Sequence, residues 1–404
     1  MGRKTISSFE INPANPLAQV RCRKNPCMPW GNVKEVRLPH LPNPKGHAMA
    51  ITITTPTILA VDLGKFNSVL CWYELSTKAT VFRTVPTTPE KIREALLRQP
   101  GVTVIVEACS PAGWVSDLCG ELGLPVVVAS TNGDAWAWKN VKRKTDRDDA
   151  LKLARLASVG ELQAVPVPPK PVRQRKSLIG LRKRLVGERT RGQNRIRGLL
   201  VGQGLPAPRG AKAWTELGLA GLSDLAKPLA ECEATELWRG ELHLLIARYR
   251  STVEQITEME RKLDALGAKD EATVLLETVP GIGPRTAEVI ATHLGDAKRF
   301  DSADEVSAYA GLVPRQYQSG ETDRRGRITK RGSKLLRSAL VECAWCSLRY
   351  NAWARGVWER LQSNGLSKKK AVVALARKLL VRCWGMLKRG EAWKDPLKPA
   401  AATV

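Results

Sequence analysis

The sequence has no long hydrophobic run. A membrane-spanning helix needs about 18–20 consecutive apolar residues, and the most apolar late stretch, AVVALARKLLVRCWGML, is interrupted by Arg377, Lys378 and Arg382. The first residues lack the apolar core of a secretory signal, and nine cysteines are scattered without the spacing of a disulfide framework. We therefore expect no membrane partner and a location in a reducing cytoplasm.

Acidic residues are scarce relative to basic ones. The 404 residues include 65 Lys and Arg against 39 Asp and Glu, a net charge of +26. Repulsion among so many positive charges destabilises a compact chain, so the net charge predicts a polyanionic partner. Nucleic acid is the first candidate for this partner. A hydrophobic content of 43% predicts a folded protein, and the length allows two or three domains.

Residues 1–53 are rich in Pro and Asn and lack aliphatic periodicity, which predicts a disordered extension. Cys22, Cys27, His40 and His47 approach the spacing of a zinc finger. The two histidines are one residue too far apart, and the apolar positions of a small zinc module are missing. Accidental spacing is therefore favoured over a zinc site.

Residues 54–162 carry an α/β pattern. Three strands in succession are followed by alternating helices and strands, which predicts a ribonuclease-H-like sheet. The expected strands are residues 57–61, residues 68–74, ATVFRTVP, VTVIVEA and PVVVAS, and the expected helices are TPEKIREALLRQ, PAGWVSDLCGELGL and KTDRDDALKLARLASVG.

Four acidic residues stand out in this region. Asp62 ends the first strand and Glu107 ends the fourth, whereas Asp146 and Asp149 are three apart on one helix face. Uncompensated carboxylates in one place repel one another. Two divalent cations roughly 4 Å apart would relieve that repulsion and clamp a phosphodiester, and Mg²⁺ suits carboxylate oxygens best. Each acid alone also fits a strand end, a cap or a solvated position.

Residues 163–268 are predicted to be a basic helical region with a coiled-coil hairpin. Residues 170–197 contain eleven Lys or Arg and one acid, with Leu178, Leu181 and Leu185 at helical spacing. Such a lopsided face predicts phosphate contacts rather than ordinary solvation. The candidate contacts are Arg173, Arg175, Lys176, Arg182, Lys183 and Arg184.

Residues 269–404 are predicted to be a mostly helical domain. Gly281 and Gly283 in VPGIGPRT allow a tight turn before a helix whose amides suit a backbone phosphate, although an ordinary connection fits equally well. Cys343 and Cys346 form a lone CxxC, for which packing is favoured over metal. His293 is expected to be structural.

Ser319 lies in GLVPRQYQSGETDRRGRITKRG, a stretch dense in basic residues. No histidine is near it in sequence to activate it as a nucleophile, and Thr322, Thr329 and Ser333 are competing hydroxyls. The surrounding cations are suited to a scissile phosphate: Arg315, Arg324, Arg325, Arg327, Lys330 and Arg331. Spacing alone favours a Ser-Gly turn in a nucleic-acid-binding loop.

The motifs AVDLGK, VIVEA, KTDRDDA, VPGIGPRTA, YAGLVPRQYQSGE and RITKRGSKLLR together resemble the Piv/MooV-type DNA invertases and their insertion-sequence transposases. The similarity spans roughly residues 55–390, with the motifs in the same order. It implies a RuvC-like DEDD catalytic domain joined to a C-terminal transposase domain with a catalytic serine.

This resemblance implies specific roles. Asp62, Glu107, Asp146 and Asp149 would be the Mg²⁺-binding tetrad, and Ser319 would attack DNA to give a covalent phosphoserine link. It further implies a homo-oligomer, dimer or tetramer, DNA partners at the element ends and target, a guiding bridge RNA, and association with the nucleoid. A RuvC-like nuclease without a covalent intermediate, a site-specific invertase and a non-catalytic nucleic-acid-binding protein stay open as alternatives.

Overall fold

The computed structural model describes residues 53, 55–130, 136, 145–319 and 322–395, and the structural statements below concern these residues. The cysteine and histidine pattern at residues 22–47 lies outside them, as does nearly all of the predicted extension. No described helix is both long and apolar enough to cross a membrane.

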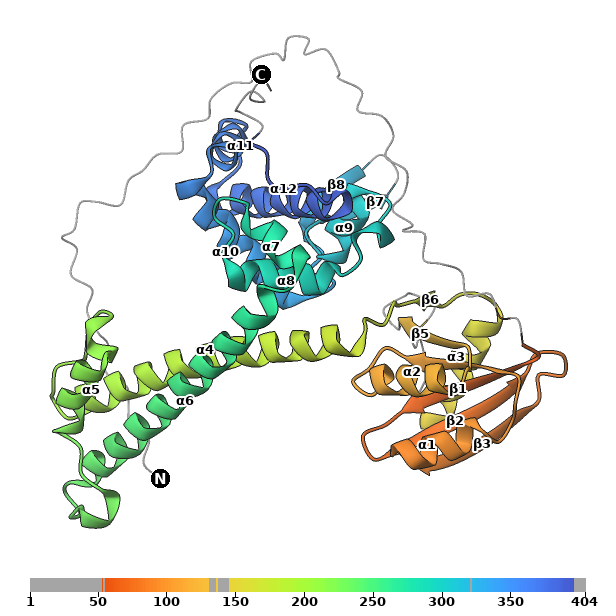
Figure 1. The fold of residues 1–404 in the computed structure, drawn as a ribbon, viewed down its shortest axis with the longest axis horizontal. Coiled ribbons are helices and arrows are strands. Elements are labelled where there is room, and N and C mark those ends of the chain that lie inside the picture. Colours follow the sequence, from red (N-terminus) through yellow and green to blue (C-terminus); the bar gives the residue numbers. More distant parts are fainter. Residues whose placement is uncertain (1–52, 54, 131–135, 137–144, 320–321, 396–404) are drawn as a thin grey trace, which may run out of the picture. The chain divides into compact units, whose positions relative to one another are not determined.

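The N-terminal part is a mixed six-stranded sheet with the strand order β3-β2-β1-β4-β5-β6 (Figure 1). β1, β4 and β5 are parallel, whereas β1, β2 and β3 form an antiparallel meander. This confirms the predicted mixed α/β sheet and is consistent with a ribonuclease-H-like domain. The strands are β1 (Thr57–Leu63), β2 (Asn67–Glu74), β3 (Thr80–Pro86), β4 (Val102–Glu107), β5 (Val126–Ser130) and β6 (Gln163–Ala164).

Helices cover both faces of this sheet. α1 (Pro89–Leu96) and α2 (Ala112–Glu121) lie on one face, and α3 (Asp146–Ser158) lies on the other. Successive side chains of a strand point to opposite faces. In β1, Val61 accordingly packs in the layer of α1 and α2, whereas Ala60 packs in the layer of α3. Any residue of β1 or β4 can therefore be assigned to a face from its position.

Two long helices follow, α4 (Lys170–Gly202) and α6 (Leu237–Gly267), and they pack against each other (Figure 1). α5 (Glu216–Ser223) connects them, with short 3-10 turns on either side. The predicted pairing of two helical segments is thus observed.

The prediction that Leu178, Leu181 and Leu185 form one buried stripe on α4 is wrong for one of the three residues. Leu185 is buried and Leu178 is partly buried, but Leu181 is 37% exposed and Ile179 is buried in its place. The reason is that α4 contacts different partners along its length. Ile179 packs in the core of the C-terminal helices, whereas Ile196 packs with residues of α5 and α6, so its buried residues do not follow one straight stripe.

The remaining chain is mostly helical around one apolar core, as predicted, with one unpredicted β-hairpin. Its strands, β7 (Pro314–Ser319) and β8 (Thr322–Ile328), are antiparallel. The helices are α7 (Glu271–Glu277), α8 (Pro284–Leu294), α9 (Ala303–Tyr309), α10 (Lys334–Tyr350), α11 (Ala352–Ser363) and α12 (Lys368–Arg389).

Two glycines fix the base of the β7–β8 hairpin. Gly311 (φ 67°) and Gly332 (φ 80°) have left-handed backbones that favour glycine. A Cβ on Gly311 would lie 2.0 Å from the carbonyl oxygen of Arg331, and one on Gly332 would lie 2.0 Å from that of Tyr309. The two chain segments can approach this closely only because both residues lack a side chain.

Candidate active site

Two predicted metal ligands lie at matching positions of neighbouring strands. In the parallel pair of β1 and β4, Val61 is in register with Val106. Asp62 and Glu107 follow these residues directly, so they occupy adjacent positions at the carboxyl ends of the two strands. Both are half-buried.

Strand alternation assigns both acids to the face that α3 covers. Ala60 and Ile105 pack in the layer of α3, and Asp62 and Glu107 lie two residues beyond them on β1 and β4. Side chains two residues apart share a face. Asp62 and Glu107 therefore lie on the α3 side of the sheet.

The start of α3 is fixed by a capping box. The backbone N–H of Asp148 donates to Oγ1 of Thr145 (3.3 Å), and the backbone N–H of Thr145 donates to Oδ2 of Asp148 (3.1 Å). This reciprocal pair satisfies helix donors that otherwise lack partners. Asp148, which lies between two residues of the predicted tetrad, thus has a structural role.

The other two predicted ligands lie in the first turns of α3. Asp146 and Asp149 each precede by four positions a residue that packs on the sheet, Ala150 and Leu153 respectively. Residues four apart share one helix face. All four acids of the predicted tetrad therefore border the layer between the sheet and α3. Within the described residues, however, no three Asp, Glu, His or Cys side chains lie close enough to hold one metal ion.

Cys109, which the sequence analysis did not single out, lies near the carboxylates at the carboxyl ends of β1 and β4 and is affected by their charge. Burial raises the pKa of its thiol, and the negative charges of Glu107 and Asp62 raise it further. Both carboxylates therefore act at one place, where a cation would be favourable. Mg²⁺ usually keeps several waters and is held by one or two carboxylates, so the adjacent carboxylates of Asp62 and Glu107 fit such a hard divalent cation without a third protein ligand.

The β7–β8 hairpin carries Ser319 at its end. Ser319 is the last residue of β7 and is paired with Thr322, the first residue of β8. Arg315, Arg324 and Arg327 are exposed on the two strands. The expected loop is thus a β-hairpin, and several of the predicted phosphate-binding residues flank the strand that ends in Ser319.

Tyr317 is a further candidate functional residue of the hairpin, and the sequence analysis did not identify it. It is 59% exposed on β7 and pairs across the hairpin with Arg324. A Cβ on Gly326 would lie 3.1 Å from its ring, so the ring lies over this glycine. Tyr317 lies two residues before Ser319, and residues two apart share a face only if the segment is a strand. The sequence analysis did not predict this strand, so it could not relate the two residues.

The hydroxyl of Ser333, an alternative to Ser319 as the nucleophile, is hydrogen-bonded within the fold. Its Oγ accepts from the backbone N–H of Leu336 (3.2 Å) at the start of α10, and it lies 2.9 Å from Nε2 of His293. His293 Nδ1 lies 2.8 Å from the carbonyl oxygen of Val289, so Nδ1 carries the proton and Nε2 accepts from Ser333. Burial lowers the pKa of His293 to about 4, which keeps the ring neutral. His293 thus links α8 to α10.

The Gly281 turn is packed against α10. Gly281 has φ 97°, and a Cβ there would lie 2.8 Å from Cα of Ser347. The buried thiol of Cys343 donates to the carbonyl oxygen of Gly281 at 3.6 Å. Close helix packing therefore explains this glycine and this cysteine. A phosphate contact by Gly281 and Gly283 before α8 stays a prediction.

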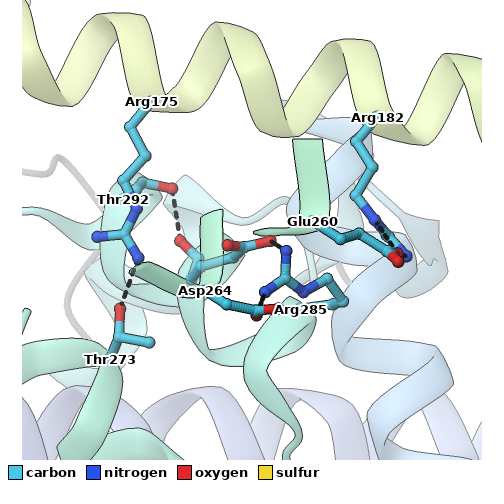
Figure 2. A network of polar contacts seen from close by, with 8 residues as sticks. Arg175, Arg182, Glu260, Asp264, Thr273, Arg285 and Thr292 are labelled. Atoms are coloured by element: carbon cyan, nitrogen blue, oxygen red, sulfur yellow. Dashed lines mark hydrogen bonds and ion pairs between the residues drawn. The ribbon is translucent and has the colours of Figure 1, made fainter. Parts of the chain in front are cut away.

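Several basic residues of α4 are paired with acids of the protein. Figure 2 shows Arg175 and Arg182 pointing from α4 toward the helices beneath it. Arg175 pairs with Asp270 (2.6 Å), and Arg182 pairs with Glu260. Arg173 likewise pairs with Asp117 of α2, and Lys183 with Glu342 of α10. These ion pairs attach α4 to its neighbours, so a phosphate would have to compete with them.

Comparison with known proteins agrees with this arrangement. A profile described as Transposase IS116/IS110/IS902 family matches residues 274–359. A second transposase profile, for the DEDD transposases of IS110, matches residues 59–203. The chain is 31% identical over 353 residues to the transposase for insertion sequence element IS1111A of Coxiella burnetii, covering 83% of this chain and 91% of that protein. The chain belongs to this transposase family.

Two other relatives broaden the comparison. The transposase for insertion sequence element IS1328 of Yersinia enterocolitica is 31% identical over 342 residues, with 83% of this chain and 97% of that protein covered. The pilin gene-inverting protein of Moraxella bovis is 37% identical over 118 residues, 28% of this chain and 36% of that protein. This transposase is therefore a DNA-processing enzyme, and its DEDD domain indicates use of a divalent metal.

Proposed function

We propose that this transposase cuts and rejoins DNA at the ends of its insertion element through a covalent phosphoserine at Ser319. The Ser319 oxygen forms a bond to the scissile phosphorus as the bond to the departing strand end breaks. The serine proton is lost, and the departing end leaves as a hydroxyl. Reversal by another strand end rejoins DNA without ATP, because the phosphoserine ester conserves the bond energy.

The observation that carries this proposal is the placement of Asp62 and Glu107. They are neighbours at the carboxyl ends of β1 and β4, on the face covered by α3, and Asp146 and Asp149 lie in the first turns of that helix. These four carboxylates would hold Mg²⁺, with two ions as the expected number. When bound, the metal would stabilise charge on the reacting phosphate.

The hairpin residues act on the DNA backbone. Arg315, Arg324 and Arg327 are exposed on the strands that flank Ser319. Guanidinium groups bind phosphate through charge-assisted hydrogen bonds and would hold the scissile phosphate against the serine. Lys330 and Arg331, exposed at the base of the hairpin, would extend this contact along the strand, as would Arg325.

The two long helices are the proposed binding elements for a bridge RNA. α4 is strongly basic and packs along α6, an arrangement suited to a coiled-coil hairpin that carries a nucleic acid on its outer surface. Lys176 and Arg184 supply phosphate contacts there. The basic residues of α4 that are in ion pairs contribute as well where a phosphate replaces their acidic partner. We further propose a homo-oligomer, dimer or tetramer, which brings two element ends together.

The test uses the full-length protein with labelled element ends, Mg²⁺ and RNA transcribed from the DNA flanking the gene. Asp62→Asn and Glu107→Gln should each lower cleavage on the order of 10²-fold or more, the scale of losing one transition-state-stabilising group. Glu121→Gln, an exposed acid of α2 on the other face of the sheet, is the matched control. Asp62→Asn with wild-type cleavage would overturn the metal-site proposal.

Site-specific inversion is a second candidate, favoured by the similarity to the pilin gene-inverting protein. It uses the same cut and rejoining but returns the segment to its own locus. A substrate with two element ends on one plasmid distinguishes the products. Excised circles indicate transposition, whereas a reversed segment with unchanged plasmid length indicates inversion.

A further inference from the structure

A groove between α11 and α12 is not used by the proposed reaction. It encloses about 550 Å³, and its two helices are packed side by side in the C-terminal part (Figure 1). Half of its lining side chains are apolar and half are cationic, and none is acidic. The lining residues are Trp353, Val357, Arg360, Ala374, Arg377, Lys378, Val381 and Arg382.

An aromatic side chain is held rigidly at one end of this groove. The ring of Trp353 meets the ring of Trp393 edge to face, with centroids 5.6 Å apart. The guanidinium carbon of Arg382 lies 4.6 Å from the Trp353 centroid and 5.4 Å from that of Trp393. These cation–π contacts fix the ring, so little conformational freedom is lost when a ligand stacks there.

The cations of the groove outnumber the acids that act on them. Arg377 pairs with Asp304 of α9 at 2.6 Å, and the negative charge of Asp395 acts on Arg382. Arg360 and Lys378 are exposed. Three further exposed lysines form the first turn of α12, Lys368–Lys370, where the helix dipole disfavours positive charge. This local concentration of charge lowers stability unless a polyanion covers it.

We propose that this groove binds an unpaired segment of nucleic acid, with bases against the apolar floor at Trp353 and phosphates on Arg360, Lys378 and Arg382. Charge alone would suit any polyanion, but an apolar floor with a fixed aromatic ring suits the flat faces of unstacked bases. Duplex DNA presents only phosphates and groove edges to a flat surface. The proposal depends on neither Ser319 nor the carboxylates, so it can fail while the proposed reaction stands.

The experiment measures binding of the full-length protein to four probes by fluorescence anisotropy, at several salt concentrations. The probes are a 20-nucleotide DNA strand, the matching RNA strand, the DNA duplex and polyglutamate. The test variant is Arg360→Gln/Lys378→Gln. The control, Lys78→Gln/Arg98→Gln, removes the same charge from exposed positions in the N-terminal part, between β2 and β3 and just after α1.

The test variant should reduce the slope of log K against log [salt] by roughly 1.4 for single strands, about 0.7 per lost phosphate contact, while the control keeps the wild-type slope. Strands that carry 5-iodouracil should crosslink to the peptide containing Trp353. Preference for the DNA or the RNA strand identifies which nucleic acid occupies the groove. Equal slopes for the test variant and control, an equally large loss of slope for the duplex or polyglutamate, or crosslinks only elsewhere would overturn the proposal.

Discussion

The buried acid Glu288 of α8 provides a quantitative test of the C-terminal core. Its side chain is 2% exposed, and its Oε1 lies 3.4 Å from Nη1 of Arg285. Burial raises the pKa of Glu288 from 4.5 to about 7, although Arg285 and the nearby Arg175 and Arg182 act in the opposite direction. Figure 2 shows these three arginines within one polar network.

The raised pKa of Glu288 determines the direction in which folding stability changes with pH. The folded protein binds the Glu288 proton more tightly than the unfolded chain, so stability is lost as the pH rises from 4.5 through 7. One pKa unit corresponds to about 1.36 kcal/mol, so the full loss is about 3 kcal/mol at pH 8 and close to zero at pH 4. Glu288→Gln keeps the volume and removes the charge. It should therefore stabilise the protein by up to about 3 kcal/mol at pH 8 and change little at pH 4.

Thermal and urea unfolding of wild type and Glu288→Gln between pH 4 and 8 measure this difference. Glu277→Gln, an exposed acid on α7, is the matched control and should track the wild type at every pH. A difference between Glu288→Gln and wild type that does not grow with pH would refute the reasoning that burial dominates the charge of Glu288.

Three further predictions concern the helix contacts, the hairpin and His293. In a double-mutant cycle, Arg182→Ala and Glu260→Ala should show a coupling on the order of 1 kcal/mol; additive effects would mean that this pair does not attach α4 to α6. Gly332→Ala should distort the hairpin and lower DNA cleavage, whereas Gly356→Ala, with no atom within 4 Å of its added Cβ, should retain wild-type cleavage; equal activities would contradict the hairpin's role. His293→Gln should weaken the fall in stability between pH 6.5 and 4, because burial lowers the pKa of His293 to about 4 and only the unfolded chain binds the proton there; unfolding curves at several pH values would show an unchanged fall if this is wrong.

The sequence predicted the N-terminal sheet well because its strands are apolar and are separated by clear turn residues. The ends of β1 and β4, and with them Asp62 and Glu107, were located from continuous apolar runs, TILAV and VTVIV. In such a sheet the order of parallel strands brings the carboxyl ends together. The neighbouring positions of these two acids could therefore be predicted without coordinates.

The hairpin and the α4 contacts could not be predicted in this way. β7 and β8 read PRQYQS and TDRRGRI, which lack the alternation of apolar and polar residues that indicates a strand. The pairing of Arg175 with Asp270 spans 95 positions in the chain, and no local pattern reports such a distance. A basic helix that binds nucleic acid and one that holds its neighbours by ion pairs have the same composition.

The most direct test of the central claim is a search for a covalent adduct between the protein and DNA. Wild type, Ser319→Ala, Ser333→Ala and Asp62→Ala are incubated with end-labelled element DNA, Mg²⁺ and the flanking RNA, then denatured. The account predicts label on wild type and Ser333→Ala, none on Ser319→Ala or Asp62→Ala, and a labelled peptide that contains Ser319. Cut DNA without any adduct, with Ser319→Ala still active, would contradict it and indicate a metal-dependent nuclease that uses water.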